Sequence, residues 1–304
     1  MIKRLKYHEI DFVKYQKALS EASQLSDFAQ QDFLNIVSGK NWGLLVYKDY
    51  EAVMPIAWSS NFGIKIIQMP ALCHQLGIFS KIDNPEVNLL FFEFLKKNFA
   101  VAYYAFNKDN AFPVDIQKKK SYVIPRNSYE EVKKKYHIHR RRNVRHTEDI
   151  QANTEFNNKI GSDQCIEEFF LENVRGIDKM SLKKVYWNTL MKLKEAGVMD
   201  LFIVKYKGDL KSFVAIYEGG QADYLSLFIN ASQLENKNLP SIAIDYQLQK
   251  CIESKNFDFM GSNVPSVASF NERFGADEYF FSILHHQKLN IISKIIKLVF
   301  TKNR

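Results

Sequence analysis

The sequence lacks a long apolar run: none of its 304 residues belongs to a stretch near the roughly 20 apolar residues that cross a bilayer as a helix. Its start, MIKRLKYHEIDF, contains no apolar signal region either. Together these absences predict a protein that is made and kept in the cytoplasm.

Cysteine is scarce as well. Cys73, Cys165 and Cys251 are scattered and odd in number, without the spacing of metal ligands, which predicts buried free thiols. The histidine pair His137 and His139 lies among positive charges that disfavour a bound cation, so we interpret it as polar surface and predict no metal site.

Positive charge is abundant in one place. The chain carries a net charge of +8, yet residues 118–145 alone hold eleven Lys or Arg against Glu130 and Glu131, a net +9. Apolar content of 46% and charged content of 25% are ordinary for a globular protein. The basic character therefore belongs to one segment and not to the fold as a whole.

The two halves of the chain repeat one order of expected elements. In the first half, strands are expected at 2–7, 42–47, 51–58, 62–68, 101–106 and 121–125, and helices at 11–20, 27–37 and 85–98. In the second half, strands are expected at 154–160, 201–206, 211–218, 223–230, 257–260 and 278–284, and helices at 163–174, 182–196, 241–253 and 266–274.

Two local matches support a duplication. Tyr47-Lys48 recurs as Tyr206-Lys207, and the run 97–99, Lys-Asn-Phe, recurs at 255–257, at offsets of 159 and 158. We therefore predict a mixed α/β protein with two tandem domains. The expected parts are a first domain at 1–128, a basic connecting helix at 129–150, a second domain at 151–287 and a basic amphipathic tail at 288–304.

The stretch 257–276 is the best candidate for one wall of a site. It predicts a buried strand that breaks at Gly261, and a helix capped by Ser262 or Asn263 with Pro265 in its first turn. That helix is expected to end at Gly275 and to bury Val267, Phe270 and Phe274. A plain strand-to-helix connection without chemistry remains the alternative.

Three blocks resemble one family. Asp258-Phe259-x-Gly261-Ser262, followed by Phe270 and 274–276 (Phe-Gly-Ala), resembles the signature of FemABX-like double-GNAT proteins. Tyr136 with the run 141–145 (Arg-Arg-Asn-Val-Arg) resembles the basic helix of the same group. In the first half, Trp42, 53–55 and 75–80 are similar to short FemAB-related proteins. The repeated element order is also that of the GNAT acyltransferase fold.

The resemblance implies an N-acyltransferase with two GNAT-like domains. Members of FemABX pass an amino acid from aminoacyl-tRNA to the side-chain amine of a cell-wall precursor peptide, and wider relatives use acyl-thioesters. One departure matters here. The GNAT pyrophosphate loop, R-x-x-G-x-G/A, should precede residue 241, but 233–240 contains no glycine. No permanently bound cofactor is expected, and the donor, aminoacyl-tRNA or acyl-CoA, stays undecided.

Two residues are candidates for catalysis. Asp258, at the end of its strand, is placed to orient or deprotonate the amine, and His139 is a second candidate base. The alternative for Asp258 is a structural carboxylate that accepts hydrogen bonds from the helix start near Asn263 or Ser266. The predicted substrate-binding residues are Gln75, Tyr136, Arg141, Arg142, Asn143, Arg145, Gly261, Ser262 and Phe270.

The expected helix over 136–145 is the electrostatic candidate. One stripe, with Val132, Tyr136 and Val144, is apolar and expected to pack, and the basic stripes can face a phosphate-bearing ligand. A solvated charge run is the alternative. For Gln75, in the long loop 71–84, a functional contact and a structural plug both remain open.

The tail places apolar residues on one face of a basic helix, which suits an anionic membrane surface or packing on the domain. The apolar positions are Ile291, Ile292, Ile295, Ile296, Val299 and Phe300. The hypothesis is thus a cytoplasmic N-acyltransferase, peripheral to the membrane if the tail binds it. The alternatives are a non-catalytic double-GNAT module that binds a nucleotide, tRNA or glycopeptide, and a CoA-dependent acetyltransferase.

Overall fold

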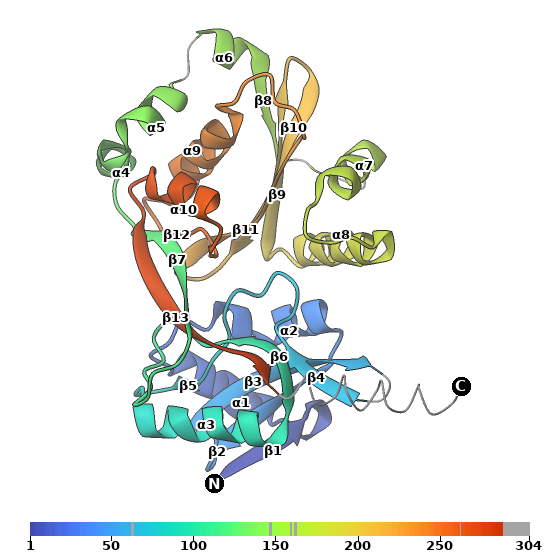
Figure 1. The fold of residues 1–304 in the computed structure, drawn as a ribbon, viewed down its shortest axis with the longest axis vertical. Coiled ribbons are helices and arrows are strands. Elements are labelled where there is room, and N and C mark those ends of the chain that lie inside the picture. The colour runs from blue at the N-terminus through green and yellow to red at the C-terminus, as the bar shows by residue number, and fades with distance from the viewer. Residues whose placement is uncertain (62–63, 146–147, 159, 161–162, 262, 288–304) are drawn as a thin grey trace. The chain divides into compact units, whose positions relative to one another are not determined.

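The computed structural model describes residues 1–304 except 62–63, 146–147, 159, 161–162, 262 and 288–304 (Figure 1). The described chain forms two compact units. Unit 1 comprises the described residues of Met1–Lys119 and Phe280–Arg304, and unit 2 comprises those of Lys120–Tyr279. Each unit is considered by itself below.

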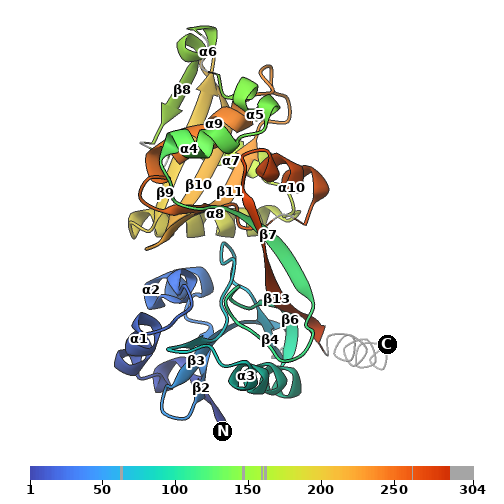
Figure 2. The ribbon, with the colours of Figure 1, turned by 90° about the vertical axis from the view of Figure 1, so that its left-hand side faces the viewer.

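Unit 1 is built on a mixed sheet. Its strands run in the order β1 (Ile2–Lys6), β2 (Trp42–Tyr47), β3 (Ala52–Asn61), β4 (Ile64–Gln68), β6 (Ala100–Ala105) and the C-terminal part of β13 (Asp277–Gln287). Within the described residues of this unit, β4 and β6 are the one parallel pair, and the short β5 (Phe79–Ser80) pairs with β3. Helices α1 (Phe12–Ser20) and α2 (Gln31–Ser38) lie on one side of the sheet and α3 (Pro85–Asn98) on the other (Figure 2).

Unit 2 repeats this plan. Its strands run in the order β7 (Lys118–Ile124), β12 (Asn256–Asp258), β11 (Ala222–Asn230), β10 (Asp209–Glu218), β9 (Met199–Tyr206) and β8 (Thr154–Asn157), with β11 and β12 parallel. Helices α9 (Leu239–Cys251) and α10 (Pro265–Glu272) lie on one side of this sheet, and α7 (Gln164–Asn173) and α8 (Met180–Glu195) on the other (Figure 1). Three short helices precede β8, namely α4 (Tyr129–Lys135), α5 (Ile138–Asn143) and α6 (Glu148–Asn153).

The expected element order is confirmed, as is the mixed α/β class. The second half has all ten expected elements in sequence, from β8 to β13. The first half has the same order up to β6, and no helix forms within the described residues 106–117 that join β6 to β7. Local signals account for the clearest boundaries: Pro85 stands in the first turn of α3, and the Asn84 side chain accepts from the Glu86 and Val87 amides.

The chain passes between the units inside two strands. β7 and β13 each have residues in both units, because the divisions fall at 119/120 and 279/280. Residues 129–150, expected to connect two domains, lie within unit 2 as α4, α5 and the start of α6. Unit 1 therefore completes its sheet with a strand that follows unit 2 in sequence.

The prediction of one continuous helix over 136–145 is wrong. The backbone is extended at Tyr136 and His137, whose ψ angles are 135° and 147°, and this separates α4 from α5. The His137 amide leaves the helical pattern to donate to the Arg273 carbonyl at 3.0 Å. A tertiary hydrogen bond thus interrupts a segment with helical periodicity.

Three further expectations need correction. Cys73 and Cys251 are buried, but Cys165 is exposed. Helix α10 buries Ala268 and Asn271, whereas Val267 is 46% exposed. Its N-cap is Val264 without a side-chain cap bond, so Asn263 does not cap it, and Ser262 lies outside the described residues.

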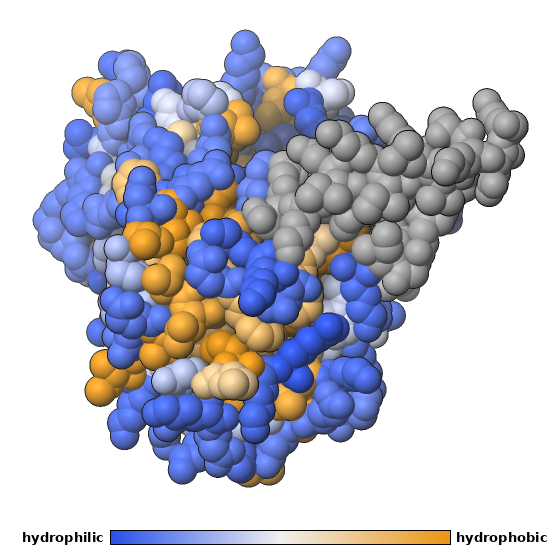
Figure 3. Space-filling view, turned by 60° about the horizontal axis from the view of Figure 1, so that its bottom comes forward, coloured by the Kyte–Doolittle hydropathy of each residue, from blue (hydrophilic) through white to orange (hydrophobic). Residues whose placement is uncertain are grey.

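The surface carries apolar side chains among hydrophilic ones (Figure 3). In unit 1 the exposed large apolar residues include Val13, Ile82, Leu90 and Val114. Such exposure is normal for a folded protein and indicates no partner by itself. No helix in the described ranges is long and apolar enough to cross a bilayer. The tail 288–304, with its predicted membrane contact, lies outside the described residues.

Two glycines give a matched test of the packing beneath α10. Gly275 has φ +71°, and a Cβ there would lie 2.6 Å from Lys135 Cβ and 2.8 Å from the Lys135 carbonyl oxygen. Gly208 has φ +85° with nothing within 4 Å. Gly208→Ala should cost about 1–2 kcal/mol for a left-handed residue with a side chain. Gly275→Ala should cost about 1–3 kcal/mol more, because the methyl group also overpacks the α4 backbone. Urea unfolding of both variants measures the difference, and equal losses would contradict the close approach.

Candidate functional site

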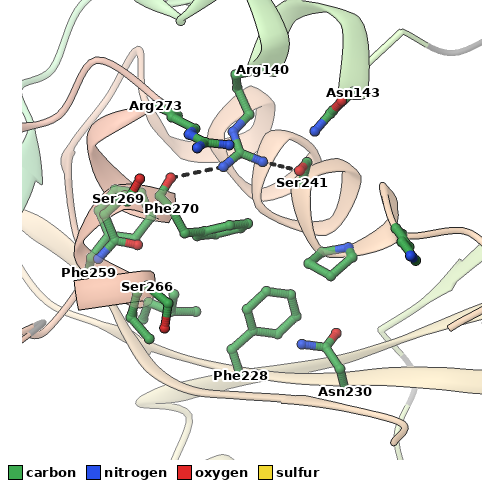
Figure 4. Close-up of a pocket in the computed structure, with 15 residues that line it drawn as sticks. Arg140, Asn143, Phe228, Asn230, Ser241, Phe259, Ser266, Ser269, Phe270 and Arg273 are labelled. Atoms are coloured by element: carbon green, nitrogen blue, oxygen red, sulfur yellow. Dashed lines mark hydrogen bonds between the residues drawn. The ribbon is translucent and has the colours of Figure 1, made fainter. Parts of the chain in front are cut away.

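Unit 2 contains a cavity of about 630 Å³ between the end of β11, the first turn of α9, α5 and α10 (Figure 4). Apolar side chains line much of it, namely Leu225, Phe228, Pro240, Phe259, Val267 and Phe270. Ser266 and Ser269 of α10 and Asn230 at the end of β11 add polar groups (Figure 4). The size and the mixture of a mostly apolar wall with a few polar groups are typical of a ligand site.

The charge of the cavity has one sign. Arg140, Lys237 and Arg273 line it, and none of its described lining residues is Asp or Glu. A cavity whose charged lining residues are all cations attracts an anion, and guanidinium groups suit phosphate and carboxylate oxygens. The electrostatics of the site therefore favour an anionic ligand.

Arg140 is the buried member of this group, 2% exposed. Its Nη1 donates to Ser241 Oγ, its Nη2 donates to the Phe270 carbonyl at 2.9 Å (Figure 4), and its Nε has no partner among the described residues. The guanidinium carbon lies 4.2 Å and 4.1 Å from the ring centres of Phe270 and Phe274. Burial, and then the charge of Arg273, lower the pKa of Arg140 to about 10, so it stays a cation at neutral pH.

No described carboxylate forms an ion pair with Arg140. A buried cation without an ion pair is costly, since its desolvation is not repaid by a nearby anion. Its carbonyl contact at the end of α10 and its two phenyl rings repay part of this cost, which is a structural role. An anion in the cavity would repay the rest.

The helical pattern explains why Arg140 is buried. Val132, Tyr136, Arg140 and Val144 recur every four residues, and all four are buried despite the break between α4 and α5. The apolar stripe predicted from the sequence thus contains an arginine at its third position. Its position in that stripe is the signal that sequence reasoning missed.

The first turn of α9 offers few free backbone donors. The Asn238 amide donates to Asn236 Oδ1, the Leu239 amide to the Asn236 carbonyl and the Ser241 amide to the Asn238 carbonyl, while Pro240 has no amide hydrogen. A glycine loop that cradles phosphate with backbone N–H groups is therefore not what this turn provides. Side chains have to bind any anion here.

β11 separates from β12 along its length. The two strands pair only at Ala222–Tyr224, although β11 continues to Asn230. A register shift against β10 leaves Ser226 as a bulge. Past Tyr224 this edge of β11 pairs with no strand in the described part of the chain, so its backbone groups border the cavity without a strand partner.

A second cavity, of about 320 Å³, lies along the same strand. It is lined by residues 227–230 of β11 with Ala231 after them, and by Asn173, Val174 and Arg175 at the end of α7. Phe228 and Asn230 line both cavities. Because α7 and α9 lie on opposite sides of the sheet (Figure 1), the two cavities approach β11 from opposite faces.

The predicted substrate-binding residues fall into three groups. Asn143 and Phe270 line the larger cavity. Arg141, Arg142, Arg145 and the candidate base His139 are exposed and line neither cavity. Tyr136 is buried and donates to Asp245 Oδ1 at 3.0 Å, and the Gly261 amide donates to Ser121 Oγ at 2.7 Å. Ser262 lies outside the described residues.

Asp258 is buried outside both cavities. It is 6% exposed and lines neither cavity. Its Oδ1 accepts from the Met260 amide at 2.8 Å and from Ser121 Oγ at 3.2 Å, and its Oδ2 accepts from Tyr279 Oη at 2.6 Å. These contacts favour the structural alternative, with donors other than the expected Asn263 and Ser266. The catalytic role of Asp258 stays a prediction.

Gln75 lies in unit 1. It is 8% exposed, and its Oε1 accepts from the Lys108 amide at 2.8 Å. Leu76, Ile78 and Phe79, in the same segment, are fully buried, and the Leu76 amide donates to the Ala105 carbonyl, beyond the part of β6 that pairs with β4. This placement favours the structural plug. The binding role of Gln75 stays a prediction.

Solved structures share this fold. FemX superposes with a TM-score of 0.61 at 12% identity, over 95% of this chain and 99% of that one. A tandem GNAT protein from the clavulanic acid biosynthesis pathway gives 0.53 at 8%, over 93% and 97%. L-PGS from Bacillus licheniformis gives 0.50 at 11%, over 97% of each chain. No protein-family profile and no curated protein matches the sequence.

These likenesses define the class of fold. The chain consists of two GNAT-like domains in tandem. Its double-GNAT fold is FemABX-like, as the sequence blocks predicted. At such low identity the likeness establishes the fold alone.

Ser241 and Ser269 separate the Arg140 contact from the cavity as a whole. Both line the cavity, but only Ser241 accepts from Arg140. Ser241→Ala should lower the free energy of unfolding by about 1–3 kcal/mol, because a buried guanidinium N–H loses its acceptor. Ser269→Ala should change it by less than about 0.5 kcal/mol. Chemical denaturation measures both, and a Ser241→Ala protein as stable as the parent would show that the bond to Arg140 is not maintained.

Proposed function

We propose that this protein is an N-acyltransferase of the GNAT type that binds a phosphate-bearing acyl donor in the larger cavity of unit 2. The observation that carries the proposal is that cavity, whose charged lining residues are all cations and include the buried Arg140. The double-GNAT fold supports the proposal, since the chain shares this fold with a tandem GNAT protein and with FemX.

In the proposed reaction the donor approaches from the α9 side. Its phosphate groups lie against Lys237, Arg273 and Arg140, and its acyl arm follows the apolar wall to the free edge of β11. The amine approaches through the smaller cavity, which shares Phe228 and Asn230 with the larger one. Binding both reactants at one strand edge would supply the proximity that acyl transfer requires.

The chemical step is a direct attack. The amine nitrogen bonds to the acyl carbon, and the ester C–O bond of an aminoacyl donor, or the C–S bond of a thioester, breaks. Backbone N–H groups of β11 would stabilise the oxyanion. No carboxylate or imidazole is among the described residues that line the two cavities, so we assign the amine proton to the leaving oxygen or sulfur.

We favour aminoacyl-tRNA as the donor and the amine of a cell-wall precursor as the acceptor. Arg140 and Asn143 of α5 line the cavity, while Arg141 and Arg142 of the same helix are exposed, so a polyanion larger than CoA gains further cationic contacts. The first turn of α9 lacks the backbone cradle of a CoA-binding loop. Acyl-CoA is the second candidate, because the tandem GNAT neighbour is described by whether AcCoA is present, and that structure is the one without it.

Asp258 and His139 have no contact with substrate in this proposal. Their predicted catalytic roles are tested directly by Asp258→Asn and His139→Ala. Turnover lost without a loss of donor binding would establish such a role, and unchanged kcat would remove it.

The donor is tested with aminoacylated tRNA and acetyl-CoA. Arg141→Ala combined with Arg145→Ala should weaken tRNA binding and reduce the slope of log K against log salt by about 1–2, because two phosphate contacts are lost. Lys134→Ala is the matched control, since Lys134 is exposed but already pairs with Glu131. Filter binding at several salt concentrations gives the slopes. A salt slope unchanged in the double variant would return these arginines to a solvated surface, and a rise in melting temperature with acetyl-CoA alone would reverse the donor assignment.

A further inference from the structure

Asp245 is a buried carboxylate on α9 that lines neither cavity. It is 1% exposed, and burial raises the pKa of its carboxyl group. Its Oδ1 accepts from Tyr129 Oη at 2.9 Å and from Tyr136 Oη at 3.0 Å, and its Oδ2 accepts from Gln249 Nε2 at 2.9 Å. Three donors on one buried carboxylate form a satisfied network, which fixes the geometry of every element that contributes to it.

Two residues of the network lie four positions from the two residues that form the Arg140–Ser241 hydrogen bond at the cavity. Asp245 lies one helical turn after Ser241, and Tyr136 lies four residues before Arg140. The Tyr136–Asp245 hydrogen bond is thus one step away from the Arg140–Ser241 hydrogen bond along the same two segments. The helix is interrupted at Tyr136 and His137. The hydrogen bond of Tyr136 to Asp245 therefore holds the chain on α9 just before α5 begins.

No described carboxylate occupies the hydrogen-bond donors that Arg140 does not use on Ser241 and the Phe270 carbonyl. The Asp245 charge opposes the lowering of the Arg140 pKa, yet Asp245 forms no ion pair with Arg140 in the described part of the chain. The tyrosine hydroxyls occupy Asp245 Oδ1, so the carboxylate acts as a counter-charge at a distance. A direct ion pair would instead take up the guanidinium N–H groups that an anion needs.

We propose that Asp245, acting through Tyr136, is a positioning residue that holds α5 on α9 so that the Arg140 guanidinium stands at the cavity wall as an anion-binding group. This inference rests on the proposed function, because it requires an anionic ligand in the larger cavity. The competing explanation is a network that only stabilises unit 2. The two explanations differ in whether the effect of Tyr136 on binding needs Arg140.

The experiment is a double-mutant cycle on the binding of inorganic pyrophosphate, measured by calorimetry at low ionic strength with the full-length protein. Tyr136→Phe should weaken binding about three- to tenfold, and Arg140→Met by about tenfold or more. In the Arg140→Met background, adding Tyr136→Phe should change binding by less than about twofold. Asp245→Asn, which keeps an acceptor but removes the charge, should weaken binding only while Arg140 is present.

Tyr15→Phe is the control for lost stability. Tyr15 is a fully buried tyrosine of unit 1 whose hydroxyl donates to the Ala29 carbonyl at 2.6 Å. The Tyr15→Phe protein should lose about as much stability as the Tyr136→Phe protein, with no change in its affinity for pyrophosphate. All measurements are made well below each variant's melting temperature, with circular dichroism as the check of folding.

Each outcome decides between the explanations. If Tyr136→Phe binds pyrophosphate as tightly as the parent while Arg140→Met does not, the positioning role is overturned and the donor site stands. If Tyr136→Phe weakens binding equally with and without Arg140, its effect does not pass through Arg140 and the role is also overturned. A parent protein that does not bind pyrophosphate at all would overturn both the inference and the proposed donor site.

Discussion

The hydrogen bonds of one buried guanidinium hold the candidate site together. Arg140 belongs to α5. Its hydrogen bonds join α5 to the first turn of α9 through Ser241 and to α10 through the Phe270 carbonyl. Its contacts with the rings of Phe270 and Phe274 fix the wall of the cavity on the side of α10. A buried cation is costly unless hydrogen bonds offset its desolvation, so these contacts constrain three helices at once. The same charge gives the cavity its preference for anions.

The two units use one topology differently. In both, a parallel strand pair stands at the centre, β4 with β6 in unit 1 and β11 with β12 in unit 2. In unit 1 the chain after β4 returns, buries Leu76, Ile78 and Phe79, and bonds to the β6 backbone at Ala105. In unit 2 residues 231–238 lead from β11 into α9, and the strand edge beyond Tyr224 borders two cavities. The segment after the first parallel strand thus packs on β6 in unit 1, whereas in unit 2 the corresponding strand borders cavities.

Periodicity and turn signals predicted the fold well, and the site only in part. Strand β2 and helix α3 begin and end where the sequence indicated, because a short apolar run before a turn, and Asn84 with Pro85, are local signals. The repeated order led to the duplication, and Asn143 and Phe270 were found through the family blocks. The importance of Arg140 was missed, because a charged residue in a basic run is ordinarily solvated. The contacts of Asp258 with Ser121 and Tyr279 join residues over a hundred positions apart or across a helix, and no local pattern contains such information.

The strands that cross between the units set the order in which the protein is completed during synthesis. β6 pairs with β4 on one side and with residues of β13 on the other, and all of unit 2 is made between these two strands. At ribosomal rates of about 5–20 residues per second, the 160 residues of unit 2 take roughly 10–30 seconds to emerge. Throughout that interval β6 is an unpaired sheet edge, the kind of surface that recruits strands from other chains. The nascent chain therefore has to shield β6 until its own last strand arrives.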